Sequence, residues 1–245
     1  MRVLGIIPAR YGSSRFPGKP LIDLKGKTMI QRVLEGTSRS TLLSAVVVAT
    51  DDTRIADHVE AIGGKVLMTS PSHPTGTDRC AEVVRQLNEQ FDVVINIQGD
   101  EPLVDARQLD QLLQAFTDPS VQIATLASRN IDLEAINNPN RIKVVVNHQN
   151  DALYFSRSAI PNAVNAKEDP LKSYPFLRHI GLYAYRPEVL LQISKLSETA
   201  LEKTESLEQL RWLYHGLSIR VVETEIETPN IDTPEDVEKV LELIP

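Results

Sequence analysis

The chain has 245 residues, 42% of them hydrophobic and 24% charged, which is typical of a folded globular protein. Its net charge of −7 argues against general binding to nucleic acid or to an anionic membrane surface, because both depend on a positive protein surface. A single cysteine excludes an internal disulfide and a cysteine-based zinc cluster, and without a run of roughly 18 apolar residues or a signal-peptide pattern we expect a cytoplasmic, non-membrane protein.

In the first half of the chain, short apolar runs alternate with helix-like stretches. We predict strands at Val3–Ala9, Ala45–Thr50, Lys65–Thr69, Val93–Gln98 and Gln122–Ala127. The predicted helices between them are Met29–Ser38, Asp52–Ile62, Thr77–Glu89 and Asp105–Phe116. The strands show little polar alternation, which suits a sheet covered on both faces. The pattern therefore predicts a doubly wound α/β fold with a mainly parallel sheet, whose ligands bind beyond the carboxyl ends of its strands.

After Pro139 the pattern changes. Two apolar runs, Ile142–Asn147 and Ala152–Phe155, are separated by turn-forming residues and predict a β-hairpin. A polar loop with several prolines follows at Pro161–Pro175, and such a loop is typical of a lid, a binding loop or a contact surface. The remaining predicted elements are a strand at His179–Tyr185, helices at Glu188–Lys195 and Ser206–Tyr214, a strand at Ile219–Glu225 and a last helix capped by Thr233. We therefore expect a smaller lobe that contains the hairpin.

The loop after the first predicted strand gathers positive charge. Arg10, Arg15 and Lys19 stand within ten residues, among hydroxyls and two glycines that let the backbone approach a ligand closely. This pattern indicates an anion-binding loop, and three converging cations suit a triphosphate. The spacing is not that of a P-loop or of G-x-G-x-x-G, which weighs against ATPase and dehydrogenase functions. A solvated Gly/Pro-rich turn is the alternative that the spacing alone leaves open.

Motifs along the whole chain point to one family. The segments concerned are Ile7–Tyr11, Arg15–Leu21, Ala49–Asp52, Gly76–Arg79, Asn96–Pro102, Ala152–Arg157, Arg178–Tyr185, Ser206–Arg211 and Ile231–Asp236. In this order, they closely resemble the motifs of the CMP-Kdo synthetase family of sugar nucleotidyltransferases, in which Kdo is 3-deoxy-manno-octulosonate. The resemblance implies a homodimeric enzyme of the nucleotide-diphospho-sugar transferase fold that uses Mg²⁺. It would consume CTP and Kdo, release diphosphate and give CMP-Kdo for lipopolysaccharide synthesis.

The resemblance also implies a single cytidylyltransferase domain whose segments have different functions. Residues 1 to about 130 would form the CTP-binding core. Residues from about 140 to 215 would form a lobe for sugar binding and dimerisation, and residues 216–245 would return to the core.

Site residues are implied by the matched motifs. The implied catalytic residues are Arg10, Arg15, Lys19, Asp100 and Asp232. The two aspartates would bind Mg²⁺, which prefers a few hard oxygen ligands completed by water and phosphate oxygens. The implied nucleotide-binding residues are Pro8, Ala9, Arg10, Ser13, Arg15, Lys19, Gly76, Thr77, Arg79 and Gln98. The implied sugar-binding residues are Gln98, Arg157, His179, Tyr185, Glu208 and Gln209.

Each of these residues, considered alone, could have a purely structural role instead of a functional one. Asp100 could be a turn residue and Asp232 an acid at a helix start. Arg157 could pair with a surface acid, and His179 could be a satisfied core residue. The prediction therefore depends on Asp100 and Asp232 meeting the cations of the first loop at one strand edge.

Two other functions stay open at this stage. A sister enzyme would carry out the same reaction on 8-amino-3,8-dideoxy-manno-octulosonate or, less readily, on sialic acid. A catalytically inactive, nucleotide-binding regulatory protein is the second alternative, although binding alone would not require both predicted metal carboxylates. The general base, the number of Mg²⁺ ions and the dimer interface do not follow from the sequence.

Overall fold

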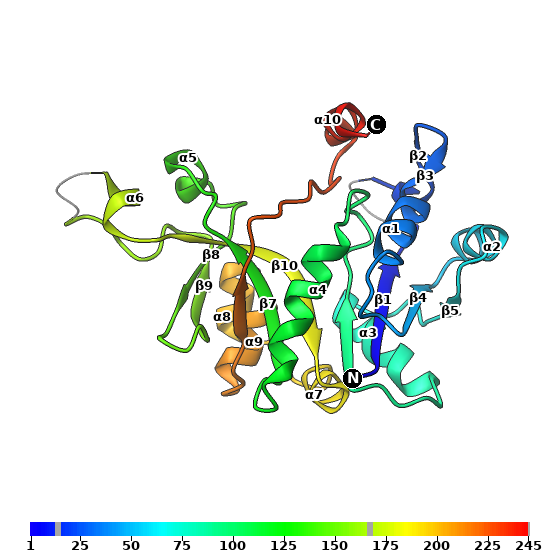
Figure 1. Cartoon of the computed structure of the whole chain (residues 1–245), viewed down its shortest axis with the longest axis horizontal. Coiled ribbons are helices and arrows are strands. Elements are labelled where there is room, and N and C mark those ends of the chain that lie inside the picture. Colours follow the sequence, from blue (N-terminus) through cyan, green and yellow to red (C-terminus); the bar gives the residue numbers. More distant parts are fainter. Residues whose placement is uncertain (13–15, 166–168, 245) are drawn as a thin grey trace. The chain divides into compact units, whose positions relative to one another are not determined.

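The computed structural model describes residues 1–12, 16–165 and 169–244, and the chain packs into two compact units (Figure 1). Unit 1 comprises Met1–Leu113, Ala184–Ser194 and Thr228–Pro245, and unit 2 comprises Gln114–Tyr183 and Lys195–Glu227. The chain leaves unit 1 twice and returns to it twice, so that segments distant in sequence share each unit. The predicted division into a CTP core, a sugar lobe and a return segment concerns function and stays a prediction.

Unit 1 is built on four parallel strands in the spatial order β6-β1-β4-β5. They are β1 (Val3–Ala9), β4 (Ala45–Thr50), β5 (Val66–Met68) and β6 (Val93–Asn96). β6 is buried along its whole length and β1 almost so, as expected for central strands of a sheet that is covered on both faces. The sheet of unit 1 is therefore parallel, as the sequence predicts. The carboxyl ends of its strands lie at one edge of the sheet.

The helices of unit 1 begin at local capping signals. They are α1 (Met29–Thr37), α2 (Thr53–Ala61), α3 (Gly76–Gln86), α4 (Ala106–Gln114, whose last residue begins unit 2), α7 (Pro187–Ile193) and α10 (Pro234–Leu243). The 3₁₀ helix η1 (Lys19–Leu21) and a small ribbon of β2 (Asp23–Leu24) and β3 (Lys27–Thr28) follow the first loop. The side chains of Thr28, Asp52 and Thr75 each accept a bond from a backbone N–H in the first turn of the next helix, which fixes where α1, α2 and α3 start.

The last helix, α10, packs against the beginning of the chain. One buried apolar cluster contains Leu24, Met29, Ile231, Val240 and Ile244. Burial of an apolar side chain of this size contributes about 1.5–3 kcal/mol to stability. In addition, Lys25 Nζ donates to the carbonyl of Ile244 at 2.6 Å. These contacts hold the segment before α10, and with it Asp232, next to the first loop.

Unit 2 combines a parallel strand pair with an antiparallel hairpin. Strand β7 (Ile123–Ser128) pairs in parallel with β11 (Arg220–Glu223). Strands β8 (Lys143–Val146) and β9 (Ala152–Ser156) form the predicted hairpin, and β8 also pairs with the start of β10 (Leu177–Tyr185). The helices are α5 (Leu133–Asn137), α6 (Pro170–Ser173), α8 (Ala200–Glu205), α9 (Gln209–Tyr214) and the 3₁₀ helix η2 (Ala115–Thr117).

One predicted helix is shorter than expected. The sequence predicts a helix over Ser206–Tyr214, but α9 starts at Gln209. Ser206 has φ 53°, in the left-handed region, and a right-handed helix cannot continue through such a residue. Instead Ser206 ends α8, which begins at a capping box of Thr199 and Glu202 and is absent from the predicted elements.

The helix α5 and the ribbon of β2 and β3 were not predicted either, and the predicted elements otherwise differ by a few residues at their ends. Val3–Ala9 and Ala45–Thr50 occur with the predicted bounds, and Thr233 is the N-cap of α10. The predicted loop Pro161–Pro175 contains the short helix α6. Within the described ranges, every helix lacks either the length or the apolar character that a membrane crossing requires.

Candidate active site

A cavity of about 250 Å³ lies in unit 1 beyond the carboxyl end of β1. Its walls come from the end of β1, η1, the start of α3, the loop after β6 and the segment before α10. The lining residues are Pro8, Ala9, Arg10, Lys19, Pro20, Met29, Thr75, Gly76, Arg79, Gln98, Gly99, Asp100 and Asp232. Parallel α/β sheets bind their ligands at this edge. Most of the predicted catalytic and nucleotide-binding residues are therefore gathered in one place.

Lys19 is the central cation of the cavity. It is the first residue of η1, and the preceding Gly18 has φ 73°, a left-handed conformation that glycine adopts without strain. The Gly18 N–H donates to the carbonyl of Tyr11 at 2.9 Å, which closes the first loop. Lys19 Nζ lies 2.9 Å from Asp100 Oδ2 and donates to the carbonyl of Ile231 at 2.7 Å. Lys19 thus joins the first loop, the loop after β6 and the segment before α10.

The two predicted metal carboxylates are brought to this cavity by backbone and side-chain bonds. The Ile231 N–H donates to the carbonyl of Asp100 at 2.9 Å, so that Asp232 follows a residue tied directly to Asp100. Asn230 Nδ2 donates to Asp232 Oδ2 at 2.8 Å. The pairing on which the sequence prediction depended, two acids and Lys19 at one strand edge, is present in unit 1.

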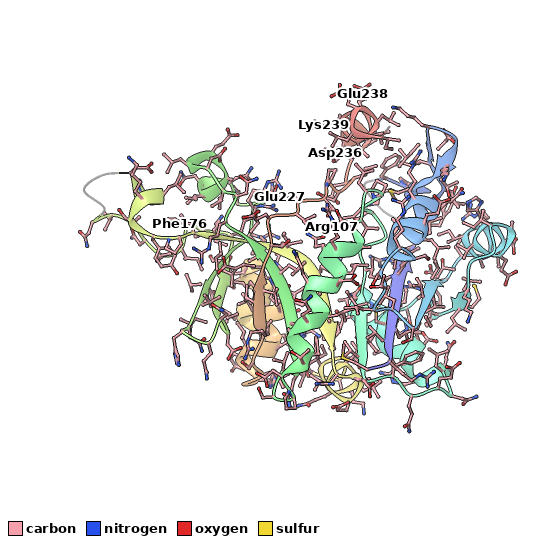
Figure 2. The ribbon with its side chains drawn as sticks, in the orientation of Figure 1. Arg107, Phe176, Glu227, Asp236, Glu238 and Lys239 are labelled. Carbon is pink, nitrogen blue, oxygen red and sulfur yellow. The ribbon has the colours of Figure 1, made fainter. Side chains whose placement is uncertain are left out.

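Asp236, in the first turn of α10, fixes the backbone at Asp232. Its Oδ2 accepts from the N–H groups of Asp232 at 3.1 Å and of Thr233 at 3.0 Å. Burial by itself would raise the pKa of Asp236, but these donors outweigh it and hold the pKa below its ordinary value. Glu238 and Lys239 also project from α10 (Figure 2), and Lys239 Nζ lies 3.6 Å from Asp236 Oδ1.

The donor set of the cavity fits Mg²⁺. Asp100 and Asp232 are two carboxylates in the lining of the cavity. The described residues contain no cluster of three or more His, Cys, Asp or Glu side chains that could hold a metal without other ligands. Mg²⁺ is commonly bound by one or two carboxylates, with water and substrate phosphates completing the octahedron. The residues present therefore suit a magnesium ion that arrives with a nucleotide.

Another part of the cavity lining comes from the end of the turn before α3 and the start of that helix. Thr75 is the N-cap of α3, and its Oγ1 accepts from the Asp78 N–H at 3.1 Å. Arg79 is only 1% exposed, its Nη1 is hydrogen-bonded to the Thr69 hydroxyl, and its Nη2 lies 3.4 Å from Asp51 Oδ2. A buried guanidinium with such partners anchors α3 against β4 and β5 while it lines the cavity.

Three predicted nucleotide-binding residues are not placed at the cavity. Thr77 lies on α3, is 3% exposed and is not among the lining residues. Ser13 and Arg15 lie outside the described residues. Arg10 is exposed and lines the cavity just after β1.

Arg157, predicted to bind the sugar, belongs to unit 2 and contacts backbone carbonyl groups. Its Nε donates to Glu205 O at 2.6 Å, Nη1 to Pro139 O at 3.0 Å and Nη2 to Ser206 O at 3.3 Å. These bonds hold the end of β9 against the turn between α8 and α9.

The Glu205 side chain reinforces the same junction. It accepts from the Ser156 hydroxyl at 2.7 Å and from the Arg157 N–H at 2.9 Å. Burial would raise the pKa of Glu205, but these bonds outweigh it and lower the pKa. The nearby Lys143 is 0% exposed and its Nζ donates to the carbonyls of Asn138 and Arg157, so Glu205 also supplies a counter-charge for a buried ammonium.

His179, also predicted to bind the sugar, is a packed and neutral imidazole. Its Nε2 lies 2.9 Å from Thr125 Oγ1, and its ring meets that of Phe155 edge to face at 4.9 Å. Burial and the neighbouring charge of Arg178 lower the pKa of His179 to about 3. The charge of Arg178 is met by Glu227, at 2.6 Å. At neutral pH His179 can therefore offer hydrogen bonds but not positive charge.

The remaining predicted sugar-binding residues are divided between the units. Gln98 lines the cavity of unit 1, and Tyr185 at the end of β10 is fully buried in that unit. Glu208 and Gln209 stand at the start of α9 in unit 2, where Gln209 is 5% exposed.

The comparisons with known proteins agree with this geometry. The profile of the cytidylyltransferase family matches residues 4–220. A 3-deoxy-manno-octulosonate cytidylyltransferase of Parabacteroides distasonis is 52% identical, with 98% of this chain and 97% of the relative covered. The enzyme of the same name from Cytophaga hutchinsonii is 51% identical, with 97% and 96% covered. The chain belongs to the 3-deoxy-manno-octulosonate cytidylyltransferase family.

Solved structures place this cytidylyltransferase in the expected fold. A CMP:2-keto-3-deoxy-manno-octonic acid synthetase complexed with CTP matches with a TM-score of 0.92 and 46% identity, over 99% of this chain and 98% of that one. A 4-diphosphocytidyl-2C-methyl-D-erythritol synthase from Anaerococcus prevotii, 16% identical, shares the fold alone, with a TM-score of 0.65 over 99% of this chain and 95% of that one. The predicted α/β class and family are confirmed.

Some residues that line the cavity of this cytidylyltransferase were not predicted. They are Pro20, Met29, Thr75 and Gly99. A Cβ atom on Gly99 would lie 2.5 Å from the carbonyl oxygen of Pro8, so only glycine allows the two loops to approach this closely. The sequence signal that could have pointed to this position is a glycine directly before Asp100.

Proposed function

We propose that the chain transfers CMP from CTP to the anomeric hydroxyl of Kdo and releases diphosphate. The observation that carries the proposal is the convergence of Lys19, Asp100 and Asp232 on one cavity, in a member of this family. The relative named CMP:2-keto-3-deoxy-manno-octonic acid synthetase is complexed with CTP. Neither alternative left open by the sequence is needed to account for these findings.

The reaction joins the sugar oxygen to the α-phosphorus of CTP and breaks the bond from that phosphorus to diphosphate, while the hydroxyl loses its proton. Arg10, Arg15 and Lys19 would hold the phosphates and stabilise the charge that develops on them. At an effective dielectric constant near 20, one cation about 4 Å from a phosphate charge contributes roughly 4 kcal/mol before desolvation. Lys19 is pre-positioned for this role because Asp100 and the Ile231 carbonyl fix its ammonium group.

Asp100 and Asp232 would hold the magnesium ion. Bound Mg²⁺ would neutralise phosphate charge and acidify the attacking hydroxyl. Asp236 would keep Asp232 in place through the Asp232 N–H, and Lys19 would limit the movement of the Asp100 carboxylate. Two rigidly held carboxylates lower the cost of ordering the site when nucleotide and metal enter.

The nucleotide would bind in the cavity along the Pro8, Ala9 and Arg10 backbone, with Gly76, Arg79 and Gln98 on the facing walls. Ser13, Arg15 and Thr77 complete the proposed nucleotide-binding set. For the sugar we propose Gln98, Arg157, His179, Tyr185, Glu208 and Gln209. His179 would act as a neutral hydrogen-bonding group, since its low pKa keeps it uncharged.

Three further properties complete the proposal. We propose a homodimer, a cytoplasmic location and a role in lipopolysaccharide synthesis, each supported by the family resemblance. Sedimentation of the purified protein tests the dimer, with a single species near the 27.3 kDa chain mass arguing against it.

A diphosphate-release assay tests the function. The full chain is incubated with CTP, Mg²⁺ and, in turn, Kdo, 8-amino-3,8-dideoxy-manno-octulosonate and sialic acid. We expect the highest kcat/KM with Kdo, together with CMP-Kdo as product. Preference for the 8-amino sugar would reassign the substrate, and binding of CTP without turnover of any sugar would support the regulatory alternative.

A further inference from the structure

The turn Ser70–Thr75, between β5 and α3, places two cavity-lining residues. It ends at Thr75 and leads directly to Gly76, and both line the cavity. It contains Pro71 and Pro74, which have no backbone N–H to donate. Its geometry therefore depends strongly on side chains that reach it from elsewhere.

Glu82 on α3 contacts this turn through its side chain. Its Oε2 accepts from the Ser70 N–H at 2.9 Å and contacts His73 Nε2, while its Oε1 accepts from Gln86 Nε2 at 2.9 Å. The side chains of Glu82 and His73 are only 23% and 17% exposed. One carboxylate thus connects the beginning and the middle of the turn to the helix that follows it.

The contacts of Glu82 are those of an ionised carboxylate. Burial would raise the pKa of Glu82, but the Ser70 N–H, His73 and Gln86 outweigh it and lower the pKa. Charge-assisted hydrogen bonds are about twice as strong as neutral ones, so neutralising Glu82 would weaken all three contacts together.

Arg79, one helical turn before Glu82, holds the start of the same turn through Thr69. Residues three apart on a helix share a face, so α3 fastens the turn through Arg79 and Glu82. Neither His73 nor Glu82 lines the cavity, so any effect they have on a ligand must pass through residues that do, such as Thr75 and Gly76 at the end of the turn.

We propose that Glu82 and His73 form a positioning pair that sets the affinity of the nucleotide site by fixing the turn Ser70–Thr75. The inference rests on the proposed function for the identity of the nucleotide, CTP. Glu82 acts on the turn and not on the reacting atoms, so its loss should weaken nucleotide binding and leave the chemical step almost unchanged.

The test compares Glu82→Gln, His73→Gln and the double variant in the full chain. Calorimetric titration without sugar gives the Kd of CTP, and steady-state kinetics gives kcat and both KM values. We expect the Kd of CTP to rise about tenfold in Glu82→Gln. At saturating substrates kcat should stay within about threefold of wild type, and the KM of the sugar within about twofold.

Glu89→Gln is the matched control. Glu89 lies beyond the end of α3, is 65% exposed and pairs with Arg2 at 2.7 Å, so the same chemical change there should leave CTP binding unaltered. In the double variant we expect the Kd of CTP to rise no further than in Glu82→Gln, because both single variants remove the same contact between Glu82 and His73.

Two results would overturn the proposal. One is an unchanged Kd of CTP in a folded Glu82→Gln whose melting temperature has fallen, since the pair would then be only structural. The other is a loss of kcat without a change in Kd. If Glu82→Gln does not fold, the Kd of CTP in His73→Gln tests the proposal instead. That variant leaves the Ser70 and Gln86 bonds of Glu82 in place, and an unchanged Kd would overturn the proposal. Failure of the proposed function is a separate outcome, since wild-type chain would then bind CTP without converting any sugar.

Discussion

The cavity in unit 1, proposed to bind the nucleotide, and the predicted sugar residues in unit 2 use their charges differently. In unit 1 the charges of Lys19, Asp100 and Asp232 face one cavity, although Lys19 and Asp100 also pair with each other. In unit 2 Arg157 donates to backbone carbonyls, Arg178 is paired with Glu227 and His179 is neutral. The difference teaches that charge at a site can serve two purposes. A partly buried ionic set that faces a cavity suits a highly charged ligand, and an internally satisfied set shapes a surface for a less charged ligand.

The largest expected effect comes from removing one charge of the unit 1 set. In Asp100→Asn the shape is kept, but a proposed metal ligand and the ionic partner of Lys19 are lost. We expect kcat/KM in the diphosphate-release assay to fall by about a thousandfold, at the upper end of the loss on removing one electrostatic group from an active site. The fold should remain, because Lys19 Nζ keeps its bond to Ile231 O.

Asp105→Asn is the control for this change. Asp105 lies outside the cavity lining, accepts from the Arg107 N–H at 2.8 Å and is paired with Arg107, which Figure 2 labels on α4. Asparagine caps helices as well as aspartate does, so activity should be close to wild type. Near-normal turnover of Asp100→Asn would show that unit 1 does not depend on its charges in this way.

A smaller effect is expected from the internally satisfied set of unit 2. Glu205→Gln places an amide N–H against the donors of Ser156 or Arg157 and removes the counter-charge of buried Lys143. We expect a loss of about 1–3 kcal/mol in the free energy of unfolding, measured by urea denaturation, together with a raised KM for the sugar and unchanged CTP binding. Glu198→Gln, in an exposed pair with Lys203, is the control and should change stability little. A drop in CTP affinity would break the distinction between the two sets.

The last expected effect concerns the pH dependence of stability through His179, which is about 1 kcal/mol for a change of one pH unit. With a folded pKa of about 3 against an ordinary 6.5, this ring binds fewer protons in the folded state than in the unfolded state between those values. The free energy of unfolding should therefore fall as the pH drops from 6.5 toward 3, with His179 contributing about 1 kcal/mol per pH unit after allowance for partial exposure.

Urea denaturation at several pH values measures this contribution. The decline should be shallower in His179→Gln than in wild type, whereas His148→Gln, in the exposed hairpin turn, should keep the wild-type slope. Equal slopes in all three proteins would mean that His179 accepts a proton freely and is not part of a satisfied, neutral set.

The fold was predictable where the signals are local. Short runs of consecutive residues predict the strands Val3–Ala9 and Ala45–Thr50 and the helix cap at Thr233. The structure contains all three. The left-handed Ser206 was not predictable in the same way, because serine adopts that backbone only when its surroundings impose it.

In the candidate site, too, residues in local motifs could be predicted and long-range contacts could not. Lys19, Gln98 and Asp100 stand in recognisable motifs, and the structure brings all of them to the cavity with Asp232. The partners of Arg157 could not be predicted, because Pro139 lies 18 and Glu205 lies 48 residues away along the chain. Contacts of this kind depend on tertiary packing, which no local pattern encodes.

The attachment of α10 has a consequence for how activity is lost on heating. Packing of the α10 cluster on Leu24 and Met29 helps to keep Asp232 at the cavity, together with the bonds of Ile231 to Asp100 and Lys19. A local opening costs less free energy than global unfolding, so the terminal helix can detach while the central strands stay paired. Catalysis would then stop reversibly at temperatures where circular dichroism still reports a nearly intact protein, with early amide exchange confined to the frayed terminus.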